Sequence, residues 1–258
     1  MLNLPNTSLF FMALLLCSIS LDVLYDLPIA IYLILYLLYS AIFFYGVSSV
    51  DSNFFIPVIC KAQTADKIVS ISFDDGPGEF TAEILQILQD YNVKAAFFCI
   101  GKHIPAHAPL LRQIYQQGHI IGNHSFSHHL LFDFFFSKPM LQDLQAMDKA
   151  MYDVIGLKPR LFRPPYGVTN PFVRNAIIRG DYIPIGWSVR SLDTVIKDEQ
   201  QLLNKCVTAL KPGAIYLFHD TQQVTRTILP TFIEQVLASG YQIVSLETLL
   251  NISAYKNS

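Results

Sequence analysis

Two long apolar runs open the chain, and a regular alternation of apolar and amphipathic segments follows them. The first fifty residues contain only two charged side chains, Asp22 and Asp26. The run from Leu27 to Val50 carries no charge and exceeds the roughly 20 apolar residues that a helix needs to cross a bilayer. We therefore expect a hairpin of two transmembrane helices, Leu4–Leu24 and Leu27–Val50, with a tight turn around Asp26.

Other interpretations of the first fifty residues are weaker. A buried core helix over Leu27–Val50 would lie outside the pattern that follows, and the first run is short for a membrane span. A cleaved signal peptide is disfavoured because no Lys or Arg precedes Lys61, so the basic start of such a peptide is missing. The sequence predicts an integral membrane anchor of one or two helices whose partner is the lipid bilayer. Its orientation stays open, because the Lys/Arg bias that sets topology is absent.

From Lys67 onward, strand-like runs alternate with helix-like runs. Alternation of this kind implies parallel βαβ units. About 190 residues with seven such repeats suit a distorted (β/α)7-type barrel, with a doubly wound open sheet as the alternative. We expect an anchor over residues 1–50, a linker over 51–66 and a catalytic domain over 67–258. Strands are expected over residues 67–73, 95–101, 119–123, 160–163, 182–188, 214–220 and 242–246, and helices over 79–93, 107–118, 138–156, 170–180, 198–210, 226–240 and 247–251.

Composition narrows the class of protein. The 18 basic and 20 acidic residues give a net charge of −2, which argues against a nucleic-acid groove. A hydrophobic fraction of 52% excludes an intrinsically disordered chain. The four cysteines form no CxxC pair and are expected to be free thiols.

Polar and ionisable residues follow five of the apolar strands directly. In parallel α/β folds the carboxyl ends of the strands meet at one rim, where the chemistry takes place. Each motif alone has an ordinary structural explanation, such as a turn or a stiff loop. Five of them at strand ends point to one site. They are Asp74-Asp75, His124-Ser125-Phe126-Ser127-His128, Arg163-Pro164-Pro165-Tyr166, Trp187 with Asp193, and Leu217 with His219.

The side chains suit metal-assisted hydrolysis. We expect His124 and His128, spaced i and i+4, to share one face of a helical turn and to bind a divalent metal together with Asp75. Two histidines and a carboxylate suit Zn²⁺ or a related ion, and leave positions for water and substrate. The neighbouring Asp74 would remain free to accept a proton, and His219 would protonate the leaving group.

Supporting residues complete this arrangement. Asp193 is expected to orient the His219 ring, and Arg163 to hold Asp74 in place.

Taken in order, these motifs resemble those of the polysaccharide deacetylase family, the NodB-homology domain of carbohydrate esterase family 4. The resemblance covers roughly Lys67–Leu250 and implies a distorted barrel that removes acetyl groups from N-acetylated sugars. It implies that Asp74 is the catalytic base, supported by Arg163, and that Asp75, His124 and His128 bind the metal. It implies that His219 is the catalytic acid, with Asp193 as its partner, and that the Tyr166 N–H donates to the oxyanion. It also implies Trp187, Leu217 and Pro165 as substrate-binding residues.

One position departs from the family pattern, because Thr194 stands where Trp often follows the aspartate.

The sequence therefore predicts a membrane-held, metal-dependent deacetylase of a peptidoglycan- or chitin-like glycan. One divalent metal is expected, Zn²⁺ before Co²⁺ or another ion, with no nucleic-acid or protein partner. The catalytic domain is expected outside the cytoplasm, where such polymers lie. The alternatives are an O-acetyl esterase on a decorated polysaccharide and a non-catalytic sugar-binding module.

Overall fold

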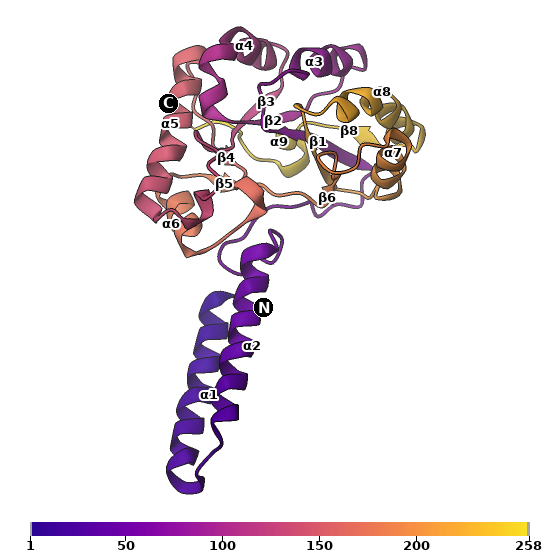
Figure 1. The fold of residues 1–258 in the computed structure, drawn as a ribbon. Coiled ribbons are helices and arrows are strands. Elements are labelled where there is room, and N and C mark those ends of the chain that lie inside the picture. The colour runs from indigo at the N-terminus through magenta and orange to yellow at the C-terminus, as the bar shows by residue number, and fades with distance from the viewer. Residues whose placement is uncertain (1, 257–258) are drawn as a thin grey trace.

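A computed structural model of the protein describes residues 2–256 and separates a helical hairpin from a rounded α/β domain (Figure 1). Helices α1 (Leu4–Tyr25) and α2 (Ile29–Ser48) form the predicted hairpin, which projects away from the domain. Asp26 ends α1 in the left-handed conformation, and the Asp22 carboxylate accepts a hydrogen bond from the Leu27 N–H at 2.6 Å. By length and apolar composition, both helices could cross a membrane. Only 6% of the residues in an 18-residue apolar stretch of each helix are buried.

The domain is built on a curled parallel sheet that forms an incomplete barrel. Its strand order is β5-β4-β3-β2-β1-β7-β6, and β8 pairs with the beginning of β1. The strands are β1 (Ile68–Asp74), β2 (Ala96–Cys99), β3 (Ile120–Asn123), β4 (Leu161–Phe162), β5 (Ile183–Pro184), β6 (Val189–Arg190), β7 (Ile215–His219) and β8 (Gln242–Ile243). The predicted barrel class is confirmed.

One strand expectation is wrong. Of the single strand expected over residues 182–188, only Ile183–Pro184 form a strand, β5. A separate strand, β6, follows at Val189–Arg190 and lies at the opposite end of the sheet. Pro184 has no N–H to donate to a neighbouring strand, and residues 185–188 connect the two strands. The described residues therefore contain eight short parallel strands rather than seven.

Helices cover the outside of the sheet, and each predicted helix is present within a few residues. A helix that packs on a sheet buries an apolar stripe, and the buried side chains of five of these helices form the main core with β1, β2 and β7, while two helices, α6 and α9, pack in smaller clusters. Gly156, at φ 74°, ends α5 in the left-handed conformation that suits glycine. The helices are α3 (Thr81–Asp90), α4 (Ala108–Gln116), α5 (Ser137–Ile155), α6 (Pro171–Arg179), α7 (Glu199–Thr208), α8 (Gln223–Ala238) and α9 (Leu246–Leu250).

The segment between the hairpin and β1 lies against the barrel. The Ile59 N–H donates to the Pro184 carbonyl at 3.0 Å, and the Ile59 carbonyl accepts from the Gly186 N–H at 2.9 Å. Ala62 donates to the Gly213 carbonyl at 2.9 Å, just before β7. The side chains of Val50, Phe54, Phe55, Ile56 and Val58 are buried. Much of the segment expected as a linker thus packs into the gap between the two ends of the sheet.

Candidate active site

The sheet register brings the predicted site residues to one rim. Asp74, the last residue of β1, lies opposite His219, the last residue of β7. On the other side, Cys99 of β2 pairs with Asn123 of β3, and Asn123 pairs with Phe162 of β4. His124 and Arg163 each follow one of these paired residues directly. Neighbouring parallel strands therefore place Asp74, His219, His124 and Arg163 together.

Three side chains form a group suited to a metal ion. The ligand atoms of Asp75, His124 and His128 all lie within 4.8 Å of one another. The Asp75 Oδ1 atom is 3.5 Å from His124 Nε2 and 3.6 Å from His128 Nε2. Burial acts to raise the pKa of Asp75, but the hydrogen bond from His124 and the nearby histidine charges hold it well below its usual range. This carboxylate is therefore ionised at neutral pH.

The two histidines are not on a helical turn, and that expectation is wrong. Residues 124–128 form an irregular loop, with Ser125 and His128 at positive φ. Side chains hold this loop: Asn123 Oδ1 accepts from the Ser125 N–H at 2.8 Å. Asp143 Oδ1 accepts from the Phe126 N–H at 2.7 Å. The imidazoles still converge, with ring centroids 4.9 Å apart, because the loop folds back on itself.

The donor set fits a divalent metal. His124 Nδ1 lies 2.9 Å from the Arg163 carbonyl oxygen, which directs Nε2 toward Asp75. Burial opposes charge on His124, but the charges of Asp74 and Asp75 raise its pKa, so a metal would displace the Nε2 proton on binding. Burial, with the charge of His124, lowers the pKa of His128 to about 4, so this ring is neutral at pH 7. With the Nε2 proton of His124 displaced, two imidazole nitrogens and one carboxylate oxygen would form the ligand set of open catalytic metal sites.

Asp74 is held apart from this group by a buried arginine. Arg163 is fully buried, and its Nη1 atom donates to Asp74 Oδ1 at 2.7 Å and to Ser72 Oγ at 2.8 Å. Its Nη2 atom donates to the Gly186 carbonyl at 2.9 Å, and its guanidinium carbon lies 4.1 Å from the Phe98 ring centroid. This arrangement fixes one carboxylate oxygen of Asp74. The other, Oδ2, lies 3.8 Å from His124 Nε2, at the edge of the metal group.

His219 and Asp193 form the second polar pair. His219 Nδ1 is 2.7 Å from Asp193 Oδ1, and the His219 N–H donates to Asp193 Oδ2 at 2.7 Å. Thr225 Oγ1 donates to the same Oδ2 atom. Burial opposes charge on the His219 ring, but the hydrogen bond and charge of Asp193, with the charges of Asp74 and Asp75, raise its pKa to about 9. The ring therefore carries a proton at neutral pH.

A cavity of about 220 Å³ is lined by the two adjacent aspartates and three of the histidines, Asp74, Asp75, His124, His128 and His219. Trp187 and Leu217, two of the three residues expected to bind substrate, lie in its wall, as does Thr194. Pro165 does not, since it is buried and its neighbour Pro164 lines the cavity instead. Tyr166 is a wall residue at φ 58°, and its hydroxyl lies 3.4 Å from His128 Nδ1.

The sequence did not reveal two further wall residues, Gly167 and Arg190. A Cβ on Gly167 would lie 2.6 Å from the Trp187 ring, so glycine at this position admits the indole. Arg190 lies in the strand-end stretch from Trp187 to Asp193, but the sequence analysis assigned it no role, and the short strand β6 places it at the cavity.

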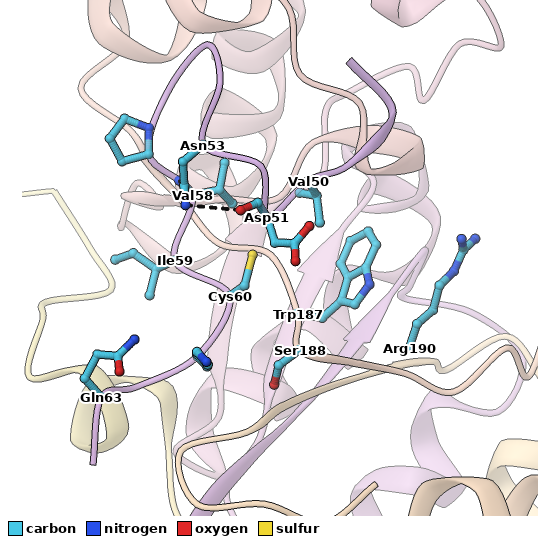
Figure 2. Close-up of a pocket in the computed structure, with 12 residues that line it drawn as sticks. Val50, Asp51, Asn53, Val58, Ile59, Cys60, Gln63, Trp187, Ser188 and Arg190 are labelled. Atoms are coloured by element: carbon cyan, nitrogen blue, oxygen red, sulfur yellow. Dashed lines mark hydrogen bonds between the residues drawn. The ribbon is translucent and has the colours of Figure 1, made fainter. Parts of the chain in front are cut away.

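A larger cavity of about 750 Å³ adjoins this site (Figure 2). Trp187 and Arg190 line both cavities, and Asp51 and Cys60 line the larger one. Burial, with the charge of Asp51, raises the pKa of the Cys60 thiol to about 11. Cys60 is therefore a neutral thiol in this wall.

Comparison with known proteins agrees with this geometry. Residues 61–182 match the family model described as polysaccharide deacetylase. A Bacillus cereus protein named peptidoglycan-N-acetylglucosamine deacetylase is 30% identical over 191 residues, which cover 72% of this chain and 89% of that protein. The chain belongs to the polysaccharide deacetylase family.

Two further relatives extend the comparison. The Listeria monocytogenes peptidoglycan-N-acetylglucosamine deacetylase PgdA is 32% identical over 200 residues, which cover 75% of this chain. That match spans only 41% of the Listeria protein. Among solved structures, the Bc1960 peptidoglycan N-acetylglucosamine deacetylase superposes with a TM-score of 0.71 at 26% identity, over 77% of this chain and 95% of that one. The curled sheet is thus the fold of this deacetylase family.

Proposed function

We propose that this protein is a membrane-anchored, metal-dependent hydrolase that removes acetyl groups from N-acetylated amino sugars of a glycan. The observation that carries the proposal is the convergence of Asp75, His124 and His128 beside two separate polar pairs. The names of the relatives support peptidoglycan as the substrate class. A chitin-like glycan shares the same N-acetyl group.

Asp75, His124 and His128 would hold the divalent ion, which we propose to be Zn²⁺. When bound, such an ion polarises an amide carbonyl and acidifies water. The irregular backbone at residues 124–128 supports this role, because it brings both Nε2 atoms toward one carboxylate oxygen.

Asp74 is proposed as the general base. Its Oδ1 atom is occupied by Arg163, so the Oδ2 atom is the one available to accept a proton from the attacking water. Loss of the Arg163 charge would free the carboxylate to rotate, which is why we assign Arg163 a positioning role.

His219 is proposed as the general acid. Asp193 fixes the ring through Nδ1 and leaves Nε2 to donate a proton to the leaving amine. A pKa of about 9 keeps that proton in place at neutral pH. The Tyr166 backbone N–H is proposed as the donor to the oxyanion, a role that requires a preorganised N–H at the rim.

The substrate pocket is proposed to be the small cavity under Trp187 and Leu217. Its volume of about 220 Å³ suits an acetyl group and part of one sugar ring rather than a long glycan segment. The hairpin is proposed to anchor residues 67–258 to the membrane. We place them on its outer side, where peptidoglycan-like polymers lie.

The test is acetate release by the full-length protein in detergent with added Zn²⁺. N-acetylglucosamine oligomers and an O-acetylated xylan are supplied in parallel, and Asp74→Asn serves as the matched control. The proposal predicts release from the N-acetylated oligomers that Asp74→Asn abolishes. Release from the xylan alone would favour the esterase, and glycan binding without release would favour a non-catalytic module.

A further inference from the structure

A group of large apolar side chains lies exposed on the loop after the histidine motif and at the start of α6, where the Phe172 ring packs against Phe136 with centroids 5.3 Å apart. We call Leu130, Leu131, Phe134, Phe136 and Phe172 the apolar patch. Leu130 is 78% exposed, Phe134 79% and Phe136 70%. Contiguous exposed apolar surface of this kind is uncommon on soluble domains and marks a contact with a partner or a membrane.

The loop that carries the patch is ordered by its other residues. Phe132 is fully buried, and both Phe132 and Phe135 pack in the core cluster that contains Val50. The Phe132 N–H donates to the His129 carbonyl at 2.8 Å, and the Phe135 N–H donates to the Phe132 carbonyl at 3.0 Å. Buried Phe132 and half-buried Phe135 thus fix the loop, and its other apolar side chains point outward.

The patch lies close to the point where the hairpin joins the domain. Asn170 Nδ2 donates to the Asp133 carbonyl at 2.7 Å, within the patch loop. The adjacent Thr169 donates from its N–H to the Val47 carbonyl and from Oγ1 to the Gly46 carbonyl, both at 3.3 Å. In Figure 1, α6 and the beginning of α5 lie at the edge of the domain from which the hairpin leaves.

There is almost no spacer between the hairpin and the domain. The Leu4 N–H, at the start of α1, donates to the Phe54 carbonyl at 2.9 Å. Near the end of α2, a Cβ on Gly46 would lie 2.4 Å from the Phe54 ring, so helix and domain are in direct contact. The 20 residues of α2 extend about 30 Å, which matches the hydrocarbon thickness of a bilayer. A bilayer that surrounds the hairpin therefore reaches this edge of the domain.

We propose that the apolar patch inserts into the lipid interface and is a second membrane contact of this protein, beside the hairpin. The proposal rests on the membrane-anchor part of the proposed function. Leu130, Leu131 and the phenylalanine rings carry no polar group that could bind sugar hydroxyls, which favours lipid over glycan as the occupant. The catalytic loop around Tyr166 leads directly to Thr169, so this contact holds the catalytic rim next to the bilayer.

Depth-dependent fluorescence quenching tests the proposal on the full chain in phosphatidylcholine vesicles that contain brominated acyl chains. The chain has a single tryptophan, Trp187, whose signal is subtracted by measuring the unmodified protein. Phe134→Trp reports on the patch. Leu37→Trp reports on the centre of α2. Tyr152→Trp, in the last turn of α5, is the matched control, since Tyr152 is also exposed.

The expected result is quenching of Phe134→Trp about two- to threefold stronger than that of Tyr152→Trp, because interfacial side chains sit roughly 5–10 Å into the headgroup and acyl boundary. Equal quenching of these two variants, with strong quenching of Leu37→Trp, would overturn the patch contact while leaving the anchor intact. A Leu37→Trp variant that is not quenched would overturn the anchor and the patch contact together. A Phe134→Trp signal that responds to soluble glycan and not to lipid would assign the patch to glycan. None of these readouts depends on enzymatic activity.

Discussion

Replacing Asp193 by Asn should lower the pKa of His219 by removing the charge that stabilises its imidazolium. The two side chains meet at 2.7 Å, and Asp193 is completely buried, so little solvent screens the pair. Asn preserves the shape of the side chain and part of its hydrogen bonding. The substitution therefore tests the effect of the Asp193 charge separately from the effect of its packing.

The magnitude follows from the pKa of His219, which is raised from 6.5 to about 9. At about 1.4 kcal/mol for each tenfold change in proton affinity, this rise corresponds to roughly 3 kcal/mol. Because the pKa is higher in the folded state, this stabilisation is fully present below pH 6.5 and is lost as the pH rises through about 9. The free energy of unfolding of Asp193→Asn should therefore differ most from that of the unmodified protein below pH 6.5. The pH-dependent part of the difference should disappear above about pH 9.

The assay is an NMR titration of the histidine rings in the metal-free, full-length protein in detergent, with denaturant unfolding at pH 6 and pH 9.5. Thr225→Val is the matched control, because it removes a hydrogen bond to Asp193 Oδ2 and leaves the charge in place. In Asp193→Asn the pKa of His219 should fall clearly below 9, and in Thr225→Val it should stay near 9. An Asp193→Asn protein whose His219 still titrates near 9 would refute the reasoning. So would an equal fall of the pKa in both variants.

Two further predictions concern the metal and the junction with the hairpin. His124→Ala and His128→Ala should each weaken Zn²⁺ binding by about 100-fold or more in calorimetry, because each removes a ligand atom. His129→Ala should bind normally, and a loss equal to that of the other two would contradict the assignment. A chain that begins at residue 61 should unfold at lower denaturant concentration than one that begins at residue 49. The shorter chain lacks Val50, Ile56 and Val58, which pack in the core cluster with Phe132 and would each stabilise the fold by roughly 1.5–3 kcal/mol. Equal unfolding midpoints would refute this.

The sequence predicted the rim of the barrel well, because strand ends are marked by an abrupt change from apolar to ionisable residues. Asp74 and His219 are the last residues of β1 and β7, and the register pairs them directly. The sequence also predicted different roles for the two neighbouring carboxylates. In the structure Asp74 forms an ion pair with Arg163, and Asp75 lies between His124 and His128. These residue roles stay predictions until they are tested by mutation.

Other features depend on contacts between distant segments, which local patterns do not encode. The i, i+4 spacing of His124 and His128 is typical of a helix, yet side chains of Asn123 and Asp143 fold the loop differently. The strands β5 and β6 are two residues long, too short for a period to be visible, so Arg190 was not predicted at the cavity.

The packing of residues 50–62 against the barrel was missed for the same reason. The partners of this segment, Pro184 and Gly213, lie more than 120 residues away in the sequence.

The most direct test of the central claim is paired measurement of metal content and acetate release in Asp74→Asn and Asp75→Asn. Asp74→Asn should keep a stoichiometric divalent ion and lose about 10²–10⁴-fold in turnover, since it removes a positioned base and no metal ligand. Asp75→Asn should lose both the ion and the activity, with partial recovery at high metal concentration. An Asp74→Asn protein without metal, together with an Asp75→Asn protein that keeps both metal and activity, would contradict the account.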